Sequence, residues 1–165
     1  MTRLKPVLIS IIVLLFLGTS IYSKINYSQV DREYVENLVD KRFVSVNNFD
    51  NGVILTPKDR EGIIGYIFYP KNDEDVNSYI PIMSKLSERG FNVYIVESPL
   101  HKNFNTNKIG NKIINSNNGI KRWIISGESE GEISAKKFYI KLKERNDLDI
   151  KFHKYYKLEK NLKEL

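Results

Sequence analysis

The most informative chemical feature of this chain is a short motif bounded by two glycines. Residues 127–131 read Gly-Glu-Ser-Glu-Gly, which fits the pattern Gly-x-Ser-x-Gly. In a sharp turn from a strand into a helix, such glycines allow close backbone packing, and the serine hydroxyl is exposed as a nucleophile. Ser129 is therefore the candidate nucleophile, and Gly127 and Gly131 are the candidate glycines of the elbow. The alternative interpretation is a glycine-rich turn with an incidental serine.

A nucleophilic serine also needs a base that takes its proton, and a third group that orients the base. The chain has two histidines, His101 and His153. His101 follows a predicted strand, so we expect it at the same sheet edge as Ser129 or in an exposed loop. His153 comes directly after a short predicted strand that we do not expect to end beside the motif, so a solvent-facing or capping role is its alternative. Asp147 and Asp149 are the carboxylates that could orient a base; the alternative is that they cap a turn.

Other kinds of site have little support in the sequence. Two isolated histidines without a clustered carboxylate do not build a metal centre, so we expect no metal and no other cofactor. The chain has no cysteine, which excludes disulfides and thiolate chemistry. It also has no phosphate-binding loop with the appropriate lysine.

The net charge of +6 is not sufficient to indicate nucleic-acid binding. The sequence has neither a stacking aromatic motif nor a zinc spacing. Part of the positive charge lies near the C-terminus, where lysines recur every three residues: Lys151, Lys154, Lys157, Lys160 and Lys163. We interpret this stretch as the solvated face of a helix, with contact to anionic polymers or lipid head groups as the alternative.

Strands and helices alternate along the chain in a way that would position the motif at a sheet edge. Apolar runs and turn residues predict strands over 43–46, 53–55, 63–69, 91–96, 122–125 and 148–152. Helical spacing predicts helices over 30–39, 79–89, 108–117 and 133–142. Continuous apolar strands alternating with helices indicate an α/β fold, with a mostly parallel sheet covered on both faces. Right-handed crossovers would place strand ends near residues 69, 97 and 126 along one edge, where open α/β sheets build their sites.

The N-terminal residues predict attachment to the cell membrane. Residues 1–5 are a basic flank, 6–22 an apolar segment of about the minimum spanning length, and 23–29 a polar linker before one domain at 30–165. The positive flank should stay cytoplasmic, which places the domain outside the cell on a single-pass signal anchor. A cleaved signal peptide is the alternative.

Four passages of the chain resemble the α/β-hydrolase superfamily, and within it the alpha/beta hydrolase fold-5 family of bacterial membrane-anchored proteins. They read Ile-Phe-Tyr-Pro at 67–70, Asn-Ser-Tyr-Ile-Pro at 77–81, Gly-Phe-Asn-Val-Tyr-Ile-Val at 90–96 with Ser-Pro-Leu at 98–100, and Trp-Ile-Ile-Ser-Gly-Glu-Ser-Glu-Gly at 123–131. In this order they cover roughly residues 33 to 145. The resemblance implies a serine hydrolase that acts on esters or similar acyl compounds. It also implies an oxyanion hole formed by the backbone N–H groups of Glu130 and Lys71.

The chain also departs from that family. In the family fold the acid and histidine follow the serine after further strands, whereas only 36 residues follow Ser129 here. Glutamates at 128, 130 and 132 surround the serine, and their charge opposes a developing oxyanion. The elbow strand should lie at or near a sheet edge, which predicts self-association that completes the sheet, a marginal half-fold or a truncated product. A non-catalytic, hydrolase-like scaffold that acts as an envelope interaction module is the alternative function.

Overall fold

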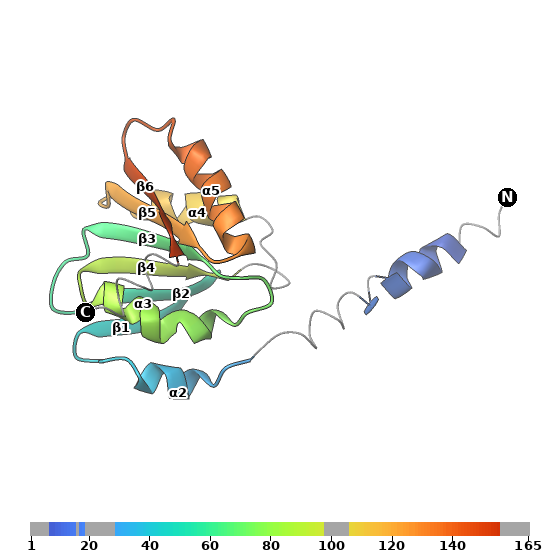
Figure 1. Ribbon diagram of the computed structural model, residues 1–165, viewed down its shortest axis with the longest axis horizontal. Helices are drawn as coiled ribbons and strands as arrows, with labels where there is room; N and C mark the ends of the chain where they lie inside the picture. Colours follow the sequence, from blue (N-terminus) through green and yellow to red (C-terminus); the bar gives the residue numbers. More distant parts are fainter. Residues whose placement is uncertain (1–6, 16, 19–28, 98–105, 156–165) are drawn as a thin grey trace.

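One six-stranded sheet forms the centre of the domain (Figure 1). The structure is a computed structural model that describes residues 7–15, 17–18, 29–97 and 106–155. The strands lie in the order β1-β2-β4-β3-β5-β6. Their bounds are β1 Val44–Phe49, β2 Gly52–Pro57, β3 Ile64–Tyr69, β4 Phe91–Val96, β5 Arg122–Gly127 and β6 Asp149–Lys154.

The sheet is mixed, with a parallel part that carries the motif. β3 pairs in parallel with β4 and with β5, and β5 pairs in parallel with β6. β1 and β2 form an antiparallel hairpin, and β2 joins the sheet antiparallel to β4. The carboxyl ends of β3, β4 and β5 therefore share one edge of the sheet, as the sequence predicts.

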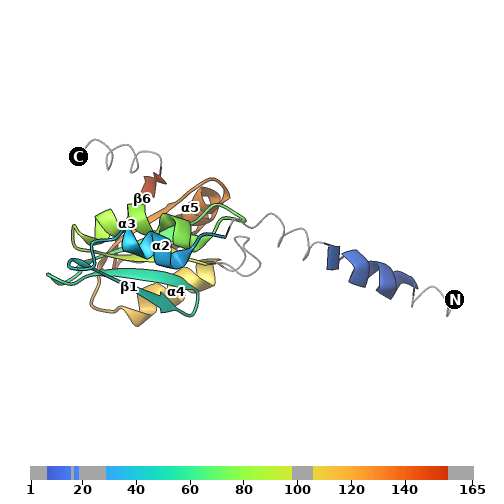
Figure 2. The same cartoon turned by 90° about the horizontal axis from the view of Figure 1, so that it is seen from below.

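Helices cover both faces of the sheet, which confirms the predicted α/β class. The helices are α2 Arg32–Asn37, α3 Ile80–Ser87, α4 Thr106–Ser116 and α5 Glu130–Leu142, and the short 3-10 helix η1 Val76–Tyr79 precedes α3. α2 and α3 lie side by side on one face (Figures 1 and 2). Their face holds an apolar core that includes Phe68, Met83 and Ile95. α4 and α5 cover a second core around Trp123 and Phe138 on the other face.

The predicted elements are found, but several of their bounds differ. α5 begins at Glu130, three residues before the predicted start at 133, because its first turn is polar and leaves no apolar signature. α2 is shorter than predicted, and the Asp31 carboxylate caps it by accepting hydrogen bonds from the backbone N–H groups of Glu33 and Tyr34. β6 ends at Lys154, two residues beyond the predicted end.

The strand that precedes the motif lies near the edge of the sheet, as the sequence predicts. β6 pairs with β5 over its whole length, from Arg122 opposite Asp149 to Gly127 opposite Lys154. β5 is therefore an inner strand, and β6 forms the edge. Contrary to the sequence-based expectation, the short strand does end beside the motif, because it runs parallel to β5 in register. Self-association through this edge stays a prediction.

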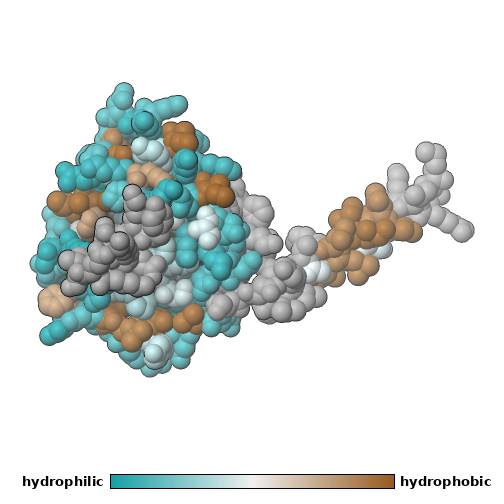
Figure 3. Space-filling model, in the orientation of Figure 1, coloured by the Kyte–Doolittle hydropathy of each residue, from teal (hydrophilic) through white to brown (hydrophobic). Residues whose placement is uncertain are grey.

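The N-terminal segment is described only in part. Residues 7–15 and 17–18 are helical, and the apolar side chains that point to solvent include Val7, Leu14 and Leu15 (Figure 3). Among the described residues, no helix combines the length and the apolar character that crossing a membrane requires. The rest of the predicted anchor, His101 and the lysines at 157, 160 and 163 lie outside the described residues.

Candidate active site

The motif forms a sharp turn between β5 and α5. β5 ends at Gly127 and α5 begins at Glu130, with Ser129 between them at φ 50° and ψ −117°. Residues other than glycine rarely adopt a positive φ, and such strain gathers at active sites. The other described non-glycine residue with positive φ is Asp73, two residues after Lys71. Both strained positions therefore lie in the two segments that the sequence assigns to the nucleophile and the oxyanion hole.

Close backbone contacts explain why glycines flank the serine. A Cβ atom on Gly131 would lie 2.0 Å from the carbonyl oxygen of Tyr69 and 2.4 Å from that of Pro70. A Cβ atom on Gly127 would lie 2.5 Å from the carbonyl carbon of Gly131. All three distances are shorter than the contacts that real Cβ atoms make. The glycines thus allow the first turn of α5 to pack directly against the end of β3.

Backbone hydrogen bonds hold this turn against the loop that carries Lys71. The N–H of Glu128 donates to the carbonyl of Tyr69 at 3.0 Å. Within the turn, the N–H of Gly131 donates to the carbonyl of Glu128 at 2.8 Å. Glu130 begins α5, so its N–H is one of the first-turn donors that have no acceptor within the helix. The geometry therefore leaves a backbone donor beside the serine.

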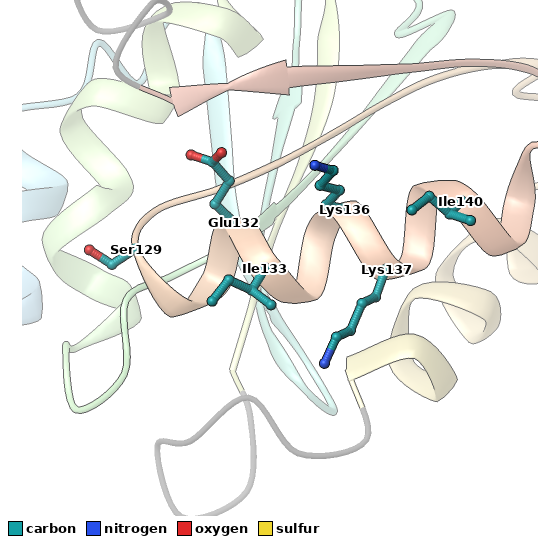
Figure 4. A pocket seen from close by; sticks show the side chains of 6 residues that line it. All are labelled: Ser129, Glu132, Ile133, Lys136, Lys137 and Ile140. Atoms are coloured by element: carbon teal, nitrogen blue, oxygen red, sulfur yellow. The ribbon is translucent and has the colours of Figure 1, made fainter.

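The Ser129 side chain is exposed and makes no capping hydrogen bond to α5. A hollow of about 580 Å³ follows the outer face of α5; its lining residues are Ser129, Glu132, Ile133, Lys136, Lys137 and Ile140 (Figure 4). The Ser129 hydroxyl points away from Ile133 and Ile140 (Figure 4). This hollow is thus an outer surface of the helix, and the hydroxyl faces the other side of the turn.

His153 lies at the same sheet edge as Ser129. Its backbone position on β6 is opposite Ser126 of β5, three residues before Ser129. The His153 side chain is exposed, and no hydrogen bond joins it to Ser129 in the part of the chain that the structure describes. The Nζ atom of the next residue, Lys154, lies 3.8 Å from a carboxylate oxygen of Glu132 and so links the end of β6 to α5.

The two candidate aspartates pair with arginines instead. A carboxylate oxygen of Asp149 lies 3.3 Å from Nε of Arg122, at the start of β5 and so at the opposite end of that strand from Ser129. A carboxylate oxygen of Asp147 lies 2.7 Å from a guanidinium nitrogen of Arg145, which lowers the pKa of Asp147. Neither carboxylate is placed to orient a base at the elbow. Both arginines stand beside their partners on the surface.

A tyrosine that sequence reasoning missed connects the two halves of the site. The hydroxyl of Tyr79 donates a hydrogen bond of 2.6 Å to Oε2 of Glu128, the residue before Ser129. The same hydroxyl oxygen accepts a hydrogen bond of 3.4 Å from the backbone N–H of Lys71. No spacing in the sequence predicts this pair, because 49 positions separate its members.

The surroundings of Tyr79 keep its hydroxyl protonated. The side chain is 5% exposed, and its ring packs against those of Phe68 and Tyr155 at centroid distances of 4.9 Å and 6.3 Å. Burial raises the pKa of Tyr79 well above its usual range, and the hydrogen bond to Glu128 raises it further. Tyr79 is therefore a hydrogen-bond donor throughout the neutral range.

Comparison with known proteins gives one family. A sequence profile described as the alpha/beta hydrolase family matches residues 65–164, from β3 onward. No curated protein matches the chain. Within the described ranges, no group of three or more His, Asp or Glu side chains is arranged to hold a metal ion.

Proposed function

The chain belongs to the alpha/beta hydrolase family, and from that premise we propose that it is a serine hydrolase of the esterase type. The family is the one that the four sequence passages resemble. The single observation that carries the proposal is the backbone of Ser129, at φ 50° and ψ −117° in a strand-to-helix turn. Such strain is retained where the surrounding structure enforces it, and here it holds an exposed hydroxyl above the sheet edge.

The proposed reaction is acyl transfer through Ser129. A base takes the proton from the hydroxyl while Oγ attacks the carbonyl carbon of an ester, and the carbonyl electron pair moves onto oxygen. The backbone N–H groups of Glu130 and Lys71 bind that oxyanion. Collapse of the intermediate expels the alcohol, which takes the proton from the base. Water then cleaves the acyl-serine and releases the acid.

His101 and His153 are the two candidate bases in this proposal. His153 is favoured by its register position at the carboxyl end of β6, beside the elbow. His101 lies outside the described residues, so its proposed role rests on the sequence alone. We assign no acid, because the aspartates that follow Ser129 pair with arginines.

Covalent labelling tests the proposal directly. The full chain, purified in detergent and shown to be folded by circular dichroism, is treated with a fluorophosphonate and examined by intact mass. The expected result is one adduct per chain, which is absent from Ser129→Ala. A folded wild-type chain without an adduct would overturn the proposal.

That negative result would favour the second candidate, a non-catalytic scaffold with a hydrolase fold. The observation behind this candidate is that the Ser129 hydroxyl has no hydrogen bond to a histidine among the described residues. The glutamates at 128, 130 and 132 also place negative charge around the serine. A scaffold would act through its surface, so Ser129→Ala would then leave its biological activity unchanged.

We also propose that residues 6–22 anchor the protein in the cell membrane, with the domain outside. The apolar run and the basic residues before it support this proposal, together with the exposure of apolar side chains over residues 7–15. Recovery in the membrane fraction after alkaline carbonate extraction is the expected result. Protease added to spheroplasts should digest the domain. Release by carbonate, or protection from protease in intact spheroplasts, would contradict it.

A further inference from the structure

The elbow carries a carboxylate directly beside the proposed nucleophile. Glu128 immediately precedes the proposed nucleophile, and the structure describes it as half-buried. A negative charge close to a developing oxyanion raises the energy of the transition state, and low-dielectric surroundings increase that effect. An active site with this residue therefore needs a group that holds the Glu128 carboxylate away from the oxyanion.

Tyr79 is such a group. Its hydroxyl donates to Oε2 of Glu128 at 2.6 Å, a short distance typical of a charge-assisted bond. The phenol ring is fixed in place, because it is buried and packs against the rings of Phe68 and Tyr155. The donor is thus fixed by packing, and the carboxylate is held by the donor.

The same hydroxyl also contacts the opposite side of the site. Its oxygen accepts the N–H of Lys71, one of the two donors assigned to the oxyanion hole, at 3.4 Å; on reaction this N–H exchanges that long hydrogen bond for one to the oxyanion. A backbone hydrogen bond, from the N–H of Glu128 to the carbonyl of Tyr69, also joins these segments. Tyr79 therefore joins, through its side chain, the loop that carries Lys71 and the turn that carries Ser129.

We propose that Tyr79 is a positioning residue of the Ser129 site, and that its hydroxyl holds the Glu128 carboxylate away from the oxyanion. This inference rests on the proposed serine hydrolase function. It explains how a chain with a glutamate before its nucleophile keeps a usable elbow. The proposal gives the ring and the hydroxyl of Tyr79 different roles. The ring is sufficient for packing, whereas the O–H group is needed to hold the carboxylate.

A double-mutant cycle tests the proposal through the rate of fluorophosphonate labelling. The saturating rate constant, kinact, and the half-saturating concentration, KI, are measured for the full chain and for Tyr79→Phe, Glu128→Gln and the double variant. Tyr79→Phe should lower kinact about tenfold, the scale of a hydrogen bond to a charged group, and leave KI unchanged. Glu128→Gln removes the charge, so the double variant should regain a kinact within about twofold of that of Glu128→Gln.

Tyr94→Phe is the matched control. Tyr94 is also a buried tyrosine, and its hydroxyl donates to Oδ1 of Asn117 at 2.9 Å, away from the elbow. Its removal also costs one hydrogen bond of a buried tyrosine, here to a neutral amide, but should not change kinact. Glu128→Ala repeats the test without altering Tyr79, and it should not lower kinact because the restrained charge is gone.

Three outcomes would overturn the proposal. In the first, Tyr79→Phe has the kinact of the wild type; in the second, the double variant has a kinact as low as that of Tyr79→Phe. In the third, Glu128→Ala lowers kinact tenfold. If the wild type is not labelled at Ser129, the hydrolase proposal fails by itself. The link is then decided by hydrogen exchange of the Lys71 amide, measured by NMR. Exchange at least about tenfold faster in Tyr79→Phe than in Tyr94→Phe supports the link, and equal rates overturn it.

Discussion

His153 and Ser126 occupy opposite positions on two neighbouring parallel strands, β6 and β5. Because parallel strands end at the same edge, this pairing brings His153 to the edge where Ser129 leaves β5. The sequence alone predicts that the last strand ends away from the motif. The role of His153 as base stays a prediction, and the position of His153 on β6 is compatible with that role.

Replacement of each histidine identifies the base. If His153 takes the proton of Ser129, His153→Gln should lower the fluorophosphonate labelling rate about a hundredfold or more, the scale of a general base. The free energy of unfolding should change little, because the side chain is exposed. The measurement is labelling by intact mass together with a thermal melt of the same sample.

His101→Gln is the comparison for that experiment. Only one histidine can be the base, so one variant should lose labelling and the other should retain it. Loss of labelling in His101→Gln alone would assign the role of the base to His101. Full labelling of both variants would exclude a histidine base altogether.

Backbone strain at Ser129 predicts that activity and stability oppose each other at this position. Glycine adopts a positive φ without steric cost, so Ser129→Gly should raise the free energy of unfolding by about 1 kcal/mol. Ser129→Ala should remove labelling without that gain, because alanine keeps the Cβ atom. Urea unfolding, followed by the fluorescence of the single tryptophan, Trp123, measures both variants. A Ser129→Gly variant no more stable than Ser129→Ala would show that the turn is unstrained.

Close packing at the first turn of α5 predicts a large cost for any side chain at Gly131. Gly131→Ala would force a methyl group against the carbonyls of Tyr69 and Pro70, and we expect it to destabilise the fold by about 3 kcal/mol. Gly119→Ala is the matched control, because nothing lies within 4 Å of the added Cβ atom. Equal stability of the two variants in urea would contradict the described contact between α5 and β3.

The inner strands β2, β3 and β4 were predictable from the sequence because they are mostly apolar runs. Phe91 to Val96 is one such run, and β4 has the predicted bounds. Such a run indicates a strand that is buried on both faces of the sheet, as is typical of a parallel strand between two layers of helices. The start of α5 was not predictable in this way, since Glu130 and Glu132 face solvent at least in part and leave no helical period of apolar residues.

The candidate site was predictable only where the chemistry is local in sequence. Residues 127–131 carry their own signal, because the strained turn and the close contact between Gly127 and Gly131 arise within five positions. The bond from Tyr79 to Glu128 joins distant segments, and it depends on how η1 packs over β3. The place of His153 likewise depends on the parallel pairing of β6, which no local pattern encodes. Tertiary packing therefore decides what surrounds the nucleophile.

Buried tyrosines predict a loss of stability in alkaline solution. Burial raises the pKa of Tyr94 to about 12, and it raises the pKa values of Tyr66 and Tyr69 still further. A buried tyrosine whose pKa is raised by folding contributes its full stabilisation below the pKa of the unfolded chain, about 10. This stabilisation is lost as the pH rises from there through the pKa of the folded state. For Tyr69, which ionises only on unfolding in this range, the free energy of unfolding should fall by about 1.4 kcal/mol per pH unit above pH 10.

Urea unfolding at pH 8, 10 and 11, followed by circular dichroism, measures this slope. Lysines also begin to titrate in the same range, so the slope of the wild type alone is not decisive. Tyr69→Phe removes one buried hydroxyl, so the fall in unfolding free energy with pH should become smaller by the contribution of one tyrosine. Tyr34→Phe is the control and should leave the slope unchanged, because the Tyr34 side chain is 65% exposed. Equal slopes for the two variants would mean that Tyr69 reaches solvent in the native state. The packing of Tyr69 against Phe138, on the face of the sheet opposite to Tyr79, would then be looser than described.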